Sequence, residues 1–265
     1  MSLFDAYTAP KKEIPRRAYL TVSVSVALLI LAVWCALSYG QLVRSDFLPT
    51  PVAVIQAGID GVSDGSLFVD TGVSLGEIMS GFILASIFAV PLGILMGSFK
   101  IVEAAIEPVT NFVRYLPVSA LIPLLILWVG IGMTEKVAVI FIGTFFQQLI
   151  LIADVSRNVS HDLLDVSYTL GASRRQVVTR VLIPATLPGV MDALRITLGW
   201  AWTYLVVAEL VAANKGLGYF ILNSMRGLFT DRIFLGIAVI GLLGLISDQL
   251  FKLLRRWLLP WTTER

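Results

Sequence analysis

The chain has 265 residues, of which 57% are hydrophobic and 14% are charged, with a formal net charge of +2. Soluble domains carry about 25% charged residues, so this composition excludes a soluble globular domain and predicts a protein embedded in a membrane. Cys35 and His161 are the single cysteine and the single histidine. Neither an intrachain disulfide nor a Cys/His metal cluster can be built from them.

Six apolar segments are long enough to cross the roughly 30 Å hydrocarbon core of a bilayer, which takes about 20 helical residues. We therefore expect an all-α membrane protein with six transmembrane helices in one domain, residues 1–265. Within it we distinguish an N-terminal segment 1–18, a six-span core 19–255 and a tail 256–265. The predicted spans are Tyr19–Tyr39, Thr71–Gly97, Val102–Val129, Lys136–Val155, Pro188–Ala213 and Ile233–Leu254.

The first span follows a basic stretch, as a secretory signal does, but its apolar run is long and has no clear cleavage site. We interpret it as a retained span. The third span is interrupted by Pro108, Pro117 and Pro123. Such breaks are tolerated in a membrane where neighbouring helices or a cavity satisfy the freed backbone groups.

The distribution of lysine and arginine predicts the orientation. If the N-terminus is cytoplasmic, the cytoplasmic segments hold thirteen basic residues and the outer segments hold five, with Arg114 and Arg195 inside spans. Lys and Arg gather on the cytoplasmic side of membrane proteins. Both termini and the polar segment 154–187 are therefore expected in the cytoplasm. On the outer side, Val52–Ile59 is expected to form a short surface helix, and Asn214–Arg232 a partly inserted or surface-packed loop.

The polar segment 154–187 lies between the fourth and fifth spans and is unusually long for a connection between membrane helices. His161–Leu170 and Arg174–Ile183 both have helical spacing, and Gly171 permits a tight reversal between them. Ser173 is suited to cap the second helix, and Pro184 is expected to end it. Two short helices joined by an elbow favour a docking site for another protein over a hairpin without a partner.

The spacing of this segment resembles the "EAA" loop of bacterial ABC-importer permeases, E-A-A-x3-G-x9-I-x-L-P. Here it reads Asp165-Val166-Ser167, three residues, Gly171, nine residues, then Val181-x-Ile183-Pro184. The first three positions depart from the pattern, while the glycine, the proline and the spacing are kept. In that family the loop holds a coupling helix that docks on a cytosolic ATPase. The resemblance implies the same role for Asp165, Leu170, Gly171, Ala172, Ser173, Arg174 and Pro184.

Further motifs resemble one branch of that family, the permeases of nitrate, sulfonate, taurine and bicarbonate importers. They occur in order from residue 47 to the last span, and the ordered set is more specific than any single motif. They are Phe47-Leu48-Pro49-x-Pro51, Pro91-Leu92-Gly93-Ile94-x-Met96-Gly97, Trp128-x-Gly130-Ile131-Gly132, Leu170-Gly171-Ala172-Ser173-Arg174, Leu194-Arg195-Ile196-x-Leu198-Gly199, Ala208-Glu209-Leu210-x-Ala212-Ala213 and Gly216-Leu217-Gly218.

The resemblance implies a type I importer fold in the bacterial inner membrane, with no covalent chemistry on this chain. The implied partners are cytoplasmic ATPase subunits, a second permease copy and an extracytoplasmic solute-binding protein. None of the six lysines lies in a phosphate-binding G-x4-G-K-[ST] loop. ATP and magnesium are therefore expected on the ATPase partner, with no cofactor or metal on this chain and no role for nucleic acid.

Polar residues within the spans are candidates for the solute path, because an intramembrane charge tends to face protein or a water-filled cavity. Arg114, predicted in mid-span beside Tyr115, offers a planar fork suited to an oxyanion, or else forms a structural ion pair. Gln147 and Gln148 either line the path or form hydrogen bonds between helices. Glu209 would repel an anion, which favours a gating or ion-pair role with Arg114 or Arg195.

Two other classes of protein remain as alternatives. A secondary transporter or channel acting without an ATPase would be expected to carry inverted repeats with paired broken helices, and none is convincing. A membrane-embedded enzyme is disfavoured by the single histidine. The sequence does not name the solute: nitrate, bicarbonate, taurine and other sulfonates all remain open.

Overall fold

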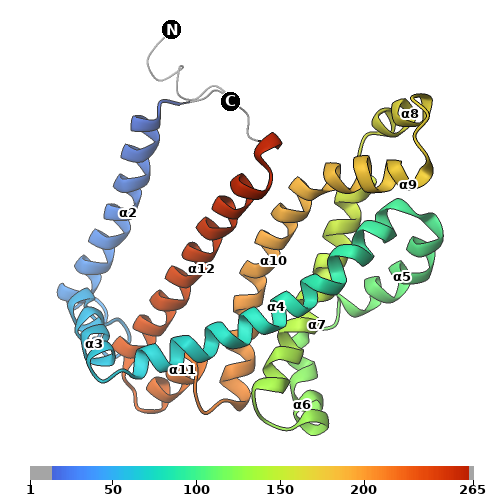
Figure 1. Ribbon diagram of the computed structural model, residues 1–265. Coiled ribbons are helices and arrows are strands. Elements are labelled where there is room, and N and C mark those ends of the chain that lie inside the picture. Colours follow the sequence, from blue (N-terminus) through green and yellow to red (C-terminus); the bar gives the residue numbers. More distant parts are fainter. Residues whose placement is uncertain (1–13, 263–265) are drawn as a thin grey trace.

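The computed structural model describes residues 14–262 and is built from helices (Figure 1). Residues 1–13 and 263–265, which hold most of the predicted N-terminal segment and the end of the tail, lie outside the described part. The helices are α2 (Arg16–Tyr39), α3 (Pro51–Ser63), α4 (Ser66–Ser98), α5 (Lys100–Val113), α6 (Val118–Val129), α7 (Met133–Arg157), α8 (His161–Thr169), α9 (Arg174–Gln176), α10 (Ile183–Ala212), α11 (Leu217–Arg226) and α12 (Thr230–Leu258). A π-helical turn, η1 (Val177–Leu182), joins α9 to α10, and a short 3-10 helix, η2 (Pro260–Thr262), follows α12.

Within residues 14–262, five helices are long and apolar enough to cross a membrane: α2, α4, α7, the α9–η1–α10 run and α12. The α5–α6 pair makes a sixth if its two parts are counted as one span. This pattern confirms the predicted all-α membrane class. The predicted surface helix at Val52–Ile59 lies inside α3, and the predicted surface-packed loop contains α11.

The third predicted span is not a straight crossing. α5 and α6 meet at an angle of 94°, and the break falls at Arg114–Pro117. Pro117 disfavours a helical conformation at Leu116 and precedes the first turn of α6, whereas Pro108 and Pro123 remain inside their helices. Arg114 therefore lies at the end of α5, in the bend between the two halves of this interrupted segment.

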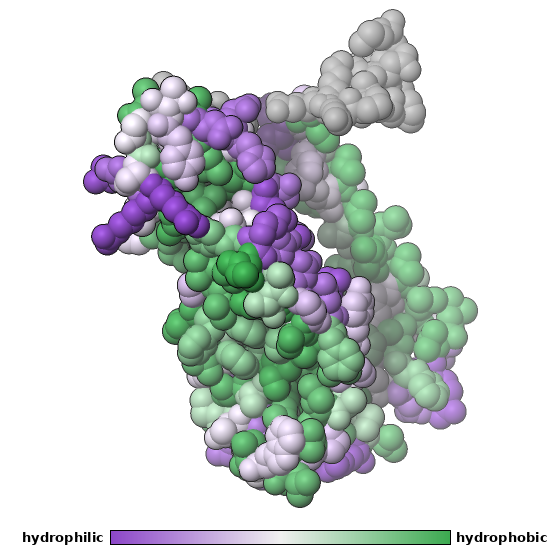
Figure 2. Space-filling model, turned by 90° about the vertical axis from the view of Figure 1, so that its right-hand side faces the viewer, coloured by the Kyte–Doolittle hydropathy of each residue, from purple (hydrophilic) through white to green (hydrophobic). Residues whose placement is uncertain are grey.

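The start of α2, the end of α12 and α8 lie at one end of the molecule, and α3 and α11 lie at the other (Figure 1). In the view of Figure 2, hydrophilic side chains gather at the two ends, and a hydrophilic strip runs from the upper end into the largely apolar surface between them. α2 and α12 contribute many exposed apolar side chains, and no residue is buried in the most apolar window of α2. Exposed apolar helices of this kind are suited to contact lipid.

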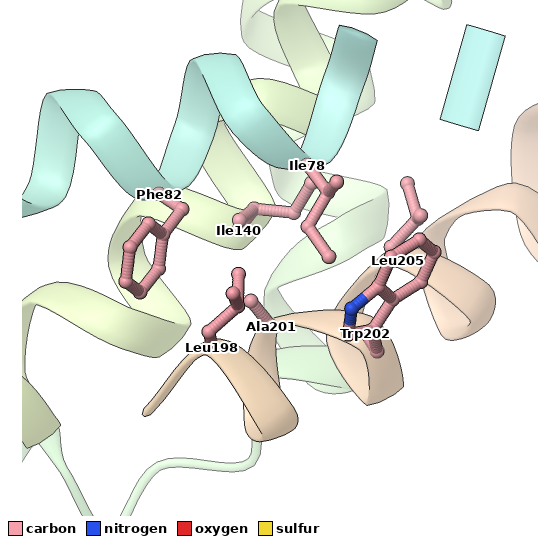
Figure 3. Packing of buried hydrophobic residues seen from close by; sticks show 7 residues of the cluster. All are labelled: Ile78, Phe82, Ile140, Leu198, Ala201, Trp202 and Leu205. Carbon is pink, nitrogen blue, oxygen red and sulfur yellow. The ribbon is translucent and has the colours of Figure 1, made fainter. Parts of the chain in front are cut away.

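The core lies where α4, α7 and α10 pack together (Figure 3). Its central cluster combines side chains of all three helices: Ile78, Phe82, Ile140, Leu198, Ala201, Trp202 and Leu205. Close approach of α4 and α7 depends on small residues, because a Cβ added at Gly93 would come 2.8 Å from Ile152. Gly97 likewise faces α7, so both glycines of this segment pack within the chain.

Ion pairs fasten α12 to α10 near the end that carries α8. Asp248 pairs with Lys252 at 2.6 Å, as its i,i+4 spacing predicts, and also with Arg195 at 3.2 Å. About two turns beyond Asp248 on α12, Arg255 donates to both oxygens of Asp192 at 2.7 and 2.9 Å. Arg195 therefore forms its ion pair with a residue of α12 and is not a partner of Glu209.

Candidate functional site

The segment between α7 and α10 forms an exposed elbow, which we define as residues 161–176. α8 has no buried residue, and Leu170 at its end is 82% exposed. Asp165 is also exposed, and its carbonyl oxygen accepts a hydrogen bond from Thr169 Oγ1 at 2.9 Å. These side chains are therefore largely exposed in the isolated chain. The elbow is therefore exposed over most of its surface, and its role in docking stays a prediction.

The turn of the elbow is built as the sequence indicates. Gly171 has φ of +83°, the left-handed conformation that favours glycine, and Ala172 follows it in the turn. Ser173 and Gln176 form a complete capping box at the start of α9. The Arg174 guanidinium lies 5.3 Å from the centre of the Phe99 ring, between α4 and α5. This cation–π contact fixes the elbow against the body of the molecule.

Pro184 does not end the second helix of the elbow, and that prediction is wrong. The chain stays helical from Arg174 to Ala212, through α9, η1 and α10. Proline has no N–H to donate and crowds the carbonyl four residues back, but here it occupies the first turn of α10. The π-helical turn η1 precedes it and supplies the wider spacing that accommodates the ring. The elbow and the fifth span are thus one continuous helical element.

A cavity of about 300 Å³ lies at the α5–α6 bend, against α7 and α10. Arg114 Nη2 donates to Tyr115 Oη at 3.0 Å, and the guanidinium lies 4.7 Å from the Tyr115 ring centre. Its Nε is buried and has no hydrogen-bond partner among the described residues. No acidic side chain belongs to the described lining, which comprises Val113, Arg114, Tyr115, Leu116, Pro117, Val118, Leu121, Ile142, Gly143, Phe146, Gln147 and Tyr204.

The two neighbouring glutamines separate. Gln147 lines the cavity with Arg114 and Tyr115. Gln148 is fully buried, and its Nε2 donates to Ser86 Oγ at 3.1 Å, which joins α7 to α4. Residues one position apart on a helix point in different directions, so only one of the pair can face the cavity. Gln147 therefore lines a cavity, whereas Gln148 forms a hydrogen bond between helices.

Glu209 lies away from the cavity, fully buried near the end of α10. Its Oε1 accepts from Ser74 Oγ, and its Oε2 accepts from the Gly218 amide, both at 2.5 Å. Neither Arg114 nor Arg195 is its partner, because Arg114 contacts Tyr115 and Arg195 pairs with Asp248. The expected ion pair is replaced by hydrogen bonds.

These bonds belong to a larger arrangement at the start of α11, which we call the α11 cap. The Leu217 amide donates to Ser74 Oγ at 2.8 Å, and the Gly216 amide donates to Asp70 Oδ1 at 2.9 Å. Three successive amides at a helix start, which have no partner within the helix, are thus satisfied by side chains of α4 and α10. Carboxylates are also favoured there by the helix dipole.

The α11 cap was missed at the sequence level, although its parts were visible. Glu209 and the Gly216-Leu217-Gly218 motif had been noted separately. A Cβ at Gly218 would come 2.7 Å from the Cβ of Glu209, and one at Gly216 would overlap the Glu209 carboxylate. The glycines are therefore needed because of the glutamate. Asp70 and Ser74, one helical turn apart on α4, were the other residues from which the α11 cap could have been predicted.

A buried ion pair lies between α4 and α7. Lys136 Nζ donates to Glu77 Oε1 at 3.0 Å, with side chains 6% and 3% exposed. The adjacent Glu135 is fully buried, and neither of its carboxyl oxygens has a hydrogen-bond partner among the described residues. Lys136 had been counted among outer-segment charges, but it is buried in the first turn of α7.

The sequence that forms this exposed elbow and broken span matches known proteins. The family model described as "Binding-protein-dependent transport system inner membrane component" matches residues 89–260. This chain belongs to that family. The permease is 34% identical over 255 residues to the taurine transport system permease protein TauC of Escherichia coli (strain K12), covering 94% of this chain and 93% of the relative. The predicted family is thereby confirmed.

Two further relatives differ in the solute that their names give. The permease is 33% identical over 232 residues to the putative aliphatic sulfonates transport permease protein SsuC of Bacillus subtilis (strain 168), covering 88% of this chain and 84% of the relative. It is 31% identical over 250 residues to the formylaminopyrimidine transport permease protein ThiX of Halalkalibacterium halodurans, covering 94% and 100%. Membership of the family therefore leaves the solute undefined.

Solved structures of ABC importers share the fold. An inward-facing MetNI methionine ABC transporter matches with a TM-score of 0.57 at 20% identity, covering 68% of this chain and 92% of that one. An amino acid ABC transporter, crystallised with histidines, matches with a TM-score of 0.59 at 14% identity, covering 77% and 97%. The predicted importer-permease fold is confirmed by these two matches.

Proposed function

We propose that this permease forms the translocation path for a small anion, driven by ATP hydrolysis on separate ATPase subunits. The elbow docks on the ATPase in the cytoplasm, and both termini lie on that same side. A second permease copy completes the path, and an extracytoplasmic binding protein delivers the solute. ATP and magnesium are held by the ATPase. The observation that carries the proposal is the elbow itself, because none of the α8 side chains is buried within the chain.

Arg114 supports an anionic solute. Its guanidinium lies on a cavity without an acidic lining residue, and its Nε has no partner among the described residues. A planar guanidinium with free donors pairs well with sulfonate, nitrate or carboxylate oxygens. Tyr115 and Gln147 add neutral donors beside it. Nitrate, bicarbonate, taurine and other sulfonates all fit this part of the cavity.

Gly171→Val tests the docking role of the elbow. Valine at a φ of +83° is strained by about 1–2 kcal/mol, and no atom near Gly171 would clash with a new Cβ. The elbow should therefore change shape without disturbing the core. We expect the variant to insert in the membrane but to lose at least tenfold in ATP-driven uptake by proteoliposomes that contain the complete transporter.

Gly65→Val is the matched control. Gly65 has φ of +77° and open space around it, but it lies between α3 and α4 at the opposite end of the molecule. It should retain association with the ATPase. Uptake at the wild-type rate by Gly171→Val, or ATP-independent uptake by the purified permease alone, would contradict the proposal and favour a transporter or channel that acts without an ATPase.

A further inference from the structure

The short helix α5 has a candidate site at each of its ends. Phe99 is the residue before its first turn, and Arg114 is the residue after its last, so 14 helical residues separate them. A helix of that length extends about 21 Å. Phe99 contacts Arg174 of the elbow, and Arg114 lines the cavity at the α5–α6 bend. α5 therefore connects the elbow directly to the cavity that contains Arg114.

The start of α5 is held on both sides of the elbow. Arg174, near the end of the elbow, lies 5.3 Å from the centre of the Phe99 ring. Arg157, the last residue of α7 before the elbow begins, pairs with Glu103 at 3.4 Å and with Glu107 at 3.6 Å. These two glutamates are one turn apart on α5, so one guanidinium holds its first two turns. We call these five residues the α5 clasp.

The remainder of α5 is held lightly within this chain. Thr110 is its single buried residue, and Val102 and Ile106 pack against a small cluster between α4 and α7. Val109 and Phe112 are 59% and 69% exposed. Segments that move in proteins are those with few buried apolar contacts. A displacement of the α5 clasp would therefore shift α5 as a unit.

The bend separates α5 from a helix that is anchored more firmly. The Arg114 amide donates to the Thr110 carbonyl oxygen at 3.0 Å, so Arg114 belongs to the last turn of α5 and moves with it. Beyond the bend, Ile122 of α6 is fully buried in a cluster with side chains of α7 and α10. A shift of α5 against α6 would change the place of Arg114 in the cavity.

We propose that the α5 clasp sets the position of Arg114, so that a displacement of the elbow reaches the anion site through α5. Phe99 and Arg157 are the positioning residues, and neither lines the cavity. This inference rests on the proposed function and deepens it, because it assigns the control of the Arg114 cavity to named contacts. The elbow is thereby attached to Arg114 by side chains and to Tyr204 by the α10 backbone.

The test follows the position of α5 in the complete transporter. Val109→Cys and Ile87→Cys carry spin labels on α5 and α4 of one permease copy, at two exposed positions. The background is Cys35→Ala, since Cys35 is the single native cysteine. The distance between the labels is measured without nucleotide and with ATP, magnesium and vanadate, which trap an ATPase during hydrolysis. We expect a change of about 2 Å or more, the scale of helix shifts in switching proteins.

Phe99→Leu removes the aromatic face but keeps an apolar side chain. It should reduce the change in label distance at least twofold, while ATPase association and basal ATP hydrolysis are retained. Phe99→Tyr keeps a ring for the guanidinium and should restore the change. Phe229→Leu is the matched control, because it removes a similar contact, between Arg232 and Phe229 at 5.0 Å, at the opposite end of the molecule. It should leave the change as in the wild type.

Arg157→Gln tests the other half of the α5 clasp. It releases Glu103 and Glu107 from α7 and should also reduce the change in label distance at least twofold. Asp154→Asn is its matched control, since Asp154 pairs with Arg157 at 3.3 Å within α7 and does not contribute to the link with α5. This variant should show the full change.

The full change in either Phe99→Leu or Arg157→Gln would overturn the role of that residue, and in both variants it would overturn the inference. A wild type with ATP-driven uptake but no change in label distance would overturn it too. The proposed function would stand in each case. Arg114→Gln tests that function separately: it should keep the change but lower uptake of every anion that the wild type carries among nitrate, bicarbonate, taurine and ethanesulfonate. Absence of ATP-driven uptake for all four would overturn the proposed function.

Discussion

The elbow and the α11 cap lie at opposite ends of the permease. They differ in the burial of their polar groups and in the partners with which these groups form hydrogen bonds. In the α11 cap, Glu209 and Ser74 are fully buried and bonded to backbone amides from another helix. In the elbow, the side-chain hydrogen bonds are local, spanning three or four residues, and the surrounding surface is exposed. The first arrangement fixes helices within one chain. The second leaves its surface exposed, which is why we propose that end for docking.

The largest effect on stability is expected from the buried ion pair between α4 and α7. Lys136→Met leaves the Glu77 carboxylate buried without its partner, which costs about 3–5 kcal/mol in comparable sites. We expect a large fall in the thermal unfolding temperature of the detergent-solubilised permease. The double variant Glu77→Gln with Lys136→Met removes both charges and should recover most of the loss. If the single variant is as stable as the wild type, the pair does not help to hold α4 on α7.

A smaller effect is expected from crowding the α11 cap. Gly218→Ala places a Cβ 2.7 Å from Glu209 Cβ and 2.9 Å from Glu209 Oε2, and overpacking of this kind costs about 1–3 kcal/mol. The unfolding temperature should fall by several degrees. Gly76→Ala on α4, where a new Cβ meets no atom within 4 Å, is the control and should be neutral or slightly stabilising. Equal unfolding temperatures for the two variants would contradict the close packing of Glu209 on α11.

The smallest effect on stability is expected in the elbow. Ser173→Ala removes the capping box of α9, with a local cost of about 1 kcal/mol. Because the elbow has few buried contacts, global unfolding should not change, but hydrogen exchange of the α9 amides should become faster. Thr50→Ala removes a cap of the same kind from α3 at the other end. Only Ser173→Ala should also weaken ATPase association, and equal affinities for both variants would mean that the cap plays no part in docking.

The sequence predicted those features that depend on local chemistry. Span positions followed from apolar length, and Gly171 and Ser173 were assigned correctly because a reversal and a helix start each require particular residues. The three prolines indicated that the third span is interrupted, but only the structure shows that the break falls at Arg114–Pro117. Continuity of the helix past Pro184 was missed, since a π-helical turn leaves no clear pattern in the sequence.

Partners that lie far apart in the chain were beyond the reach of sequence reasoning. The bond between Ser74 and Glu209 joins residues separated by 135 positions, and periodicity within one segment carries no information about it. The same holds for Lys136 and Glu77, which are separated by 59 positions. Roles of the elbow and cavity residues in docking and solute binding remain predictions that the proposed experiments test.

The uninterrupted run from α9 through α10 has a mechanical consequence. Thirty residues of α-helix extend about 45 Å. No loop separates α9 from Glu209 near the far end of α10, and Tyr204 lies between them on the same helix. If the elbow docks on an ATPase as proposed, a displacement of α9 would therefore be passed along α10 to Tyr204, which lines the cavity that contains Arg114.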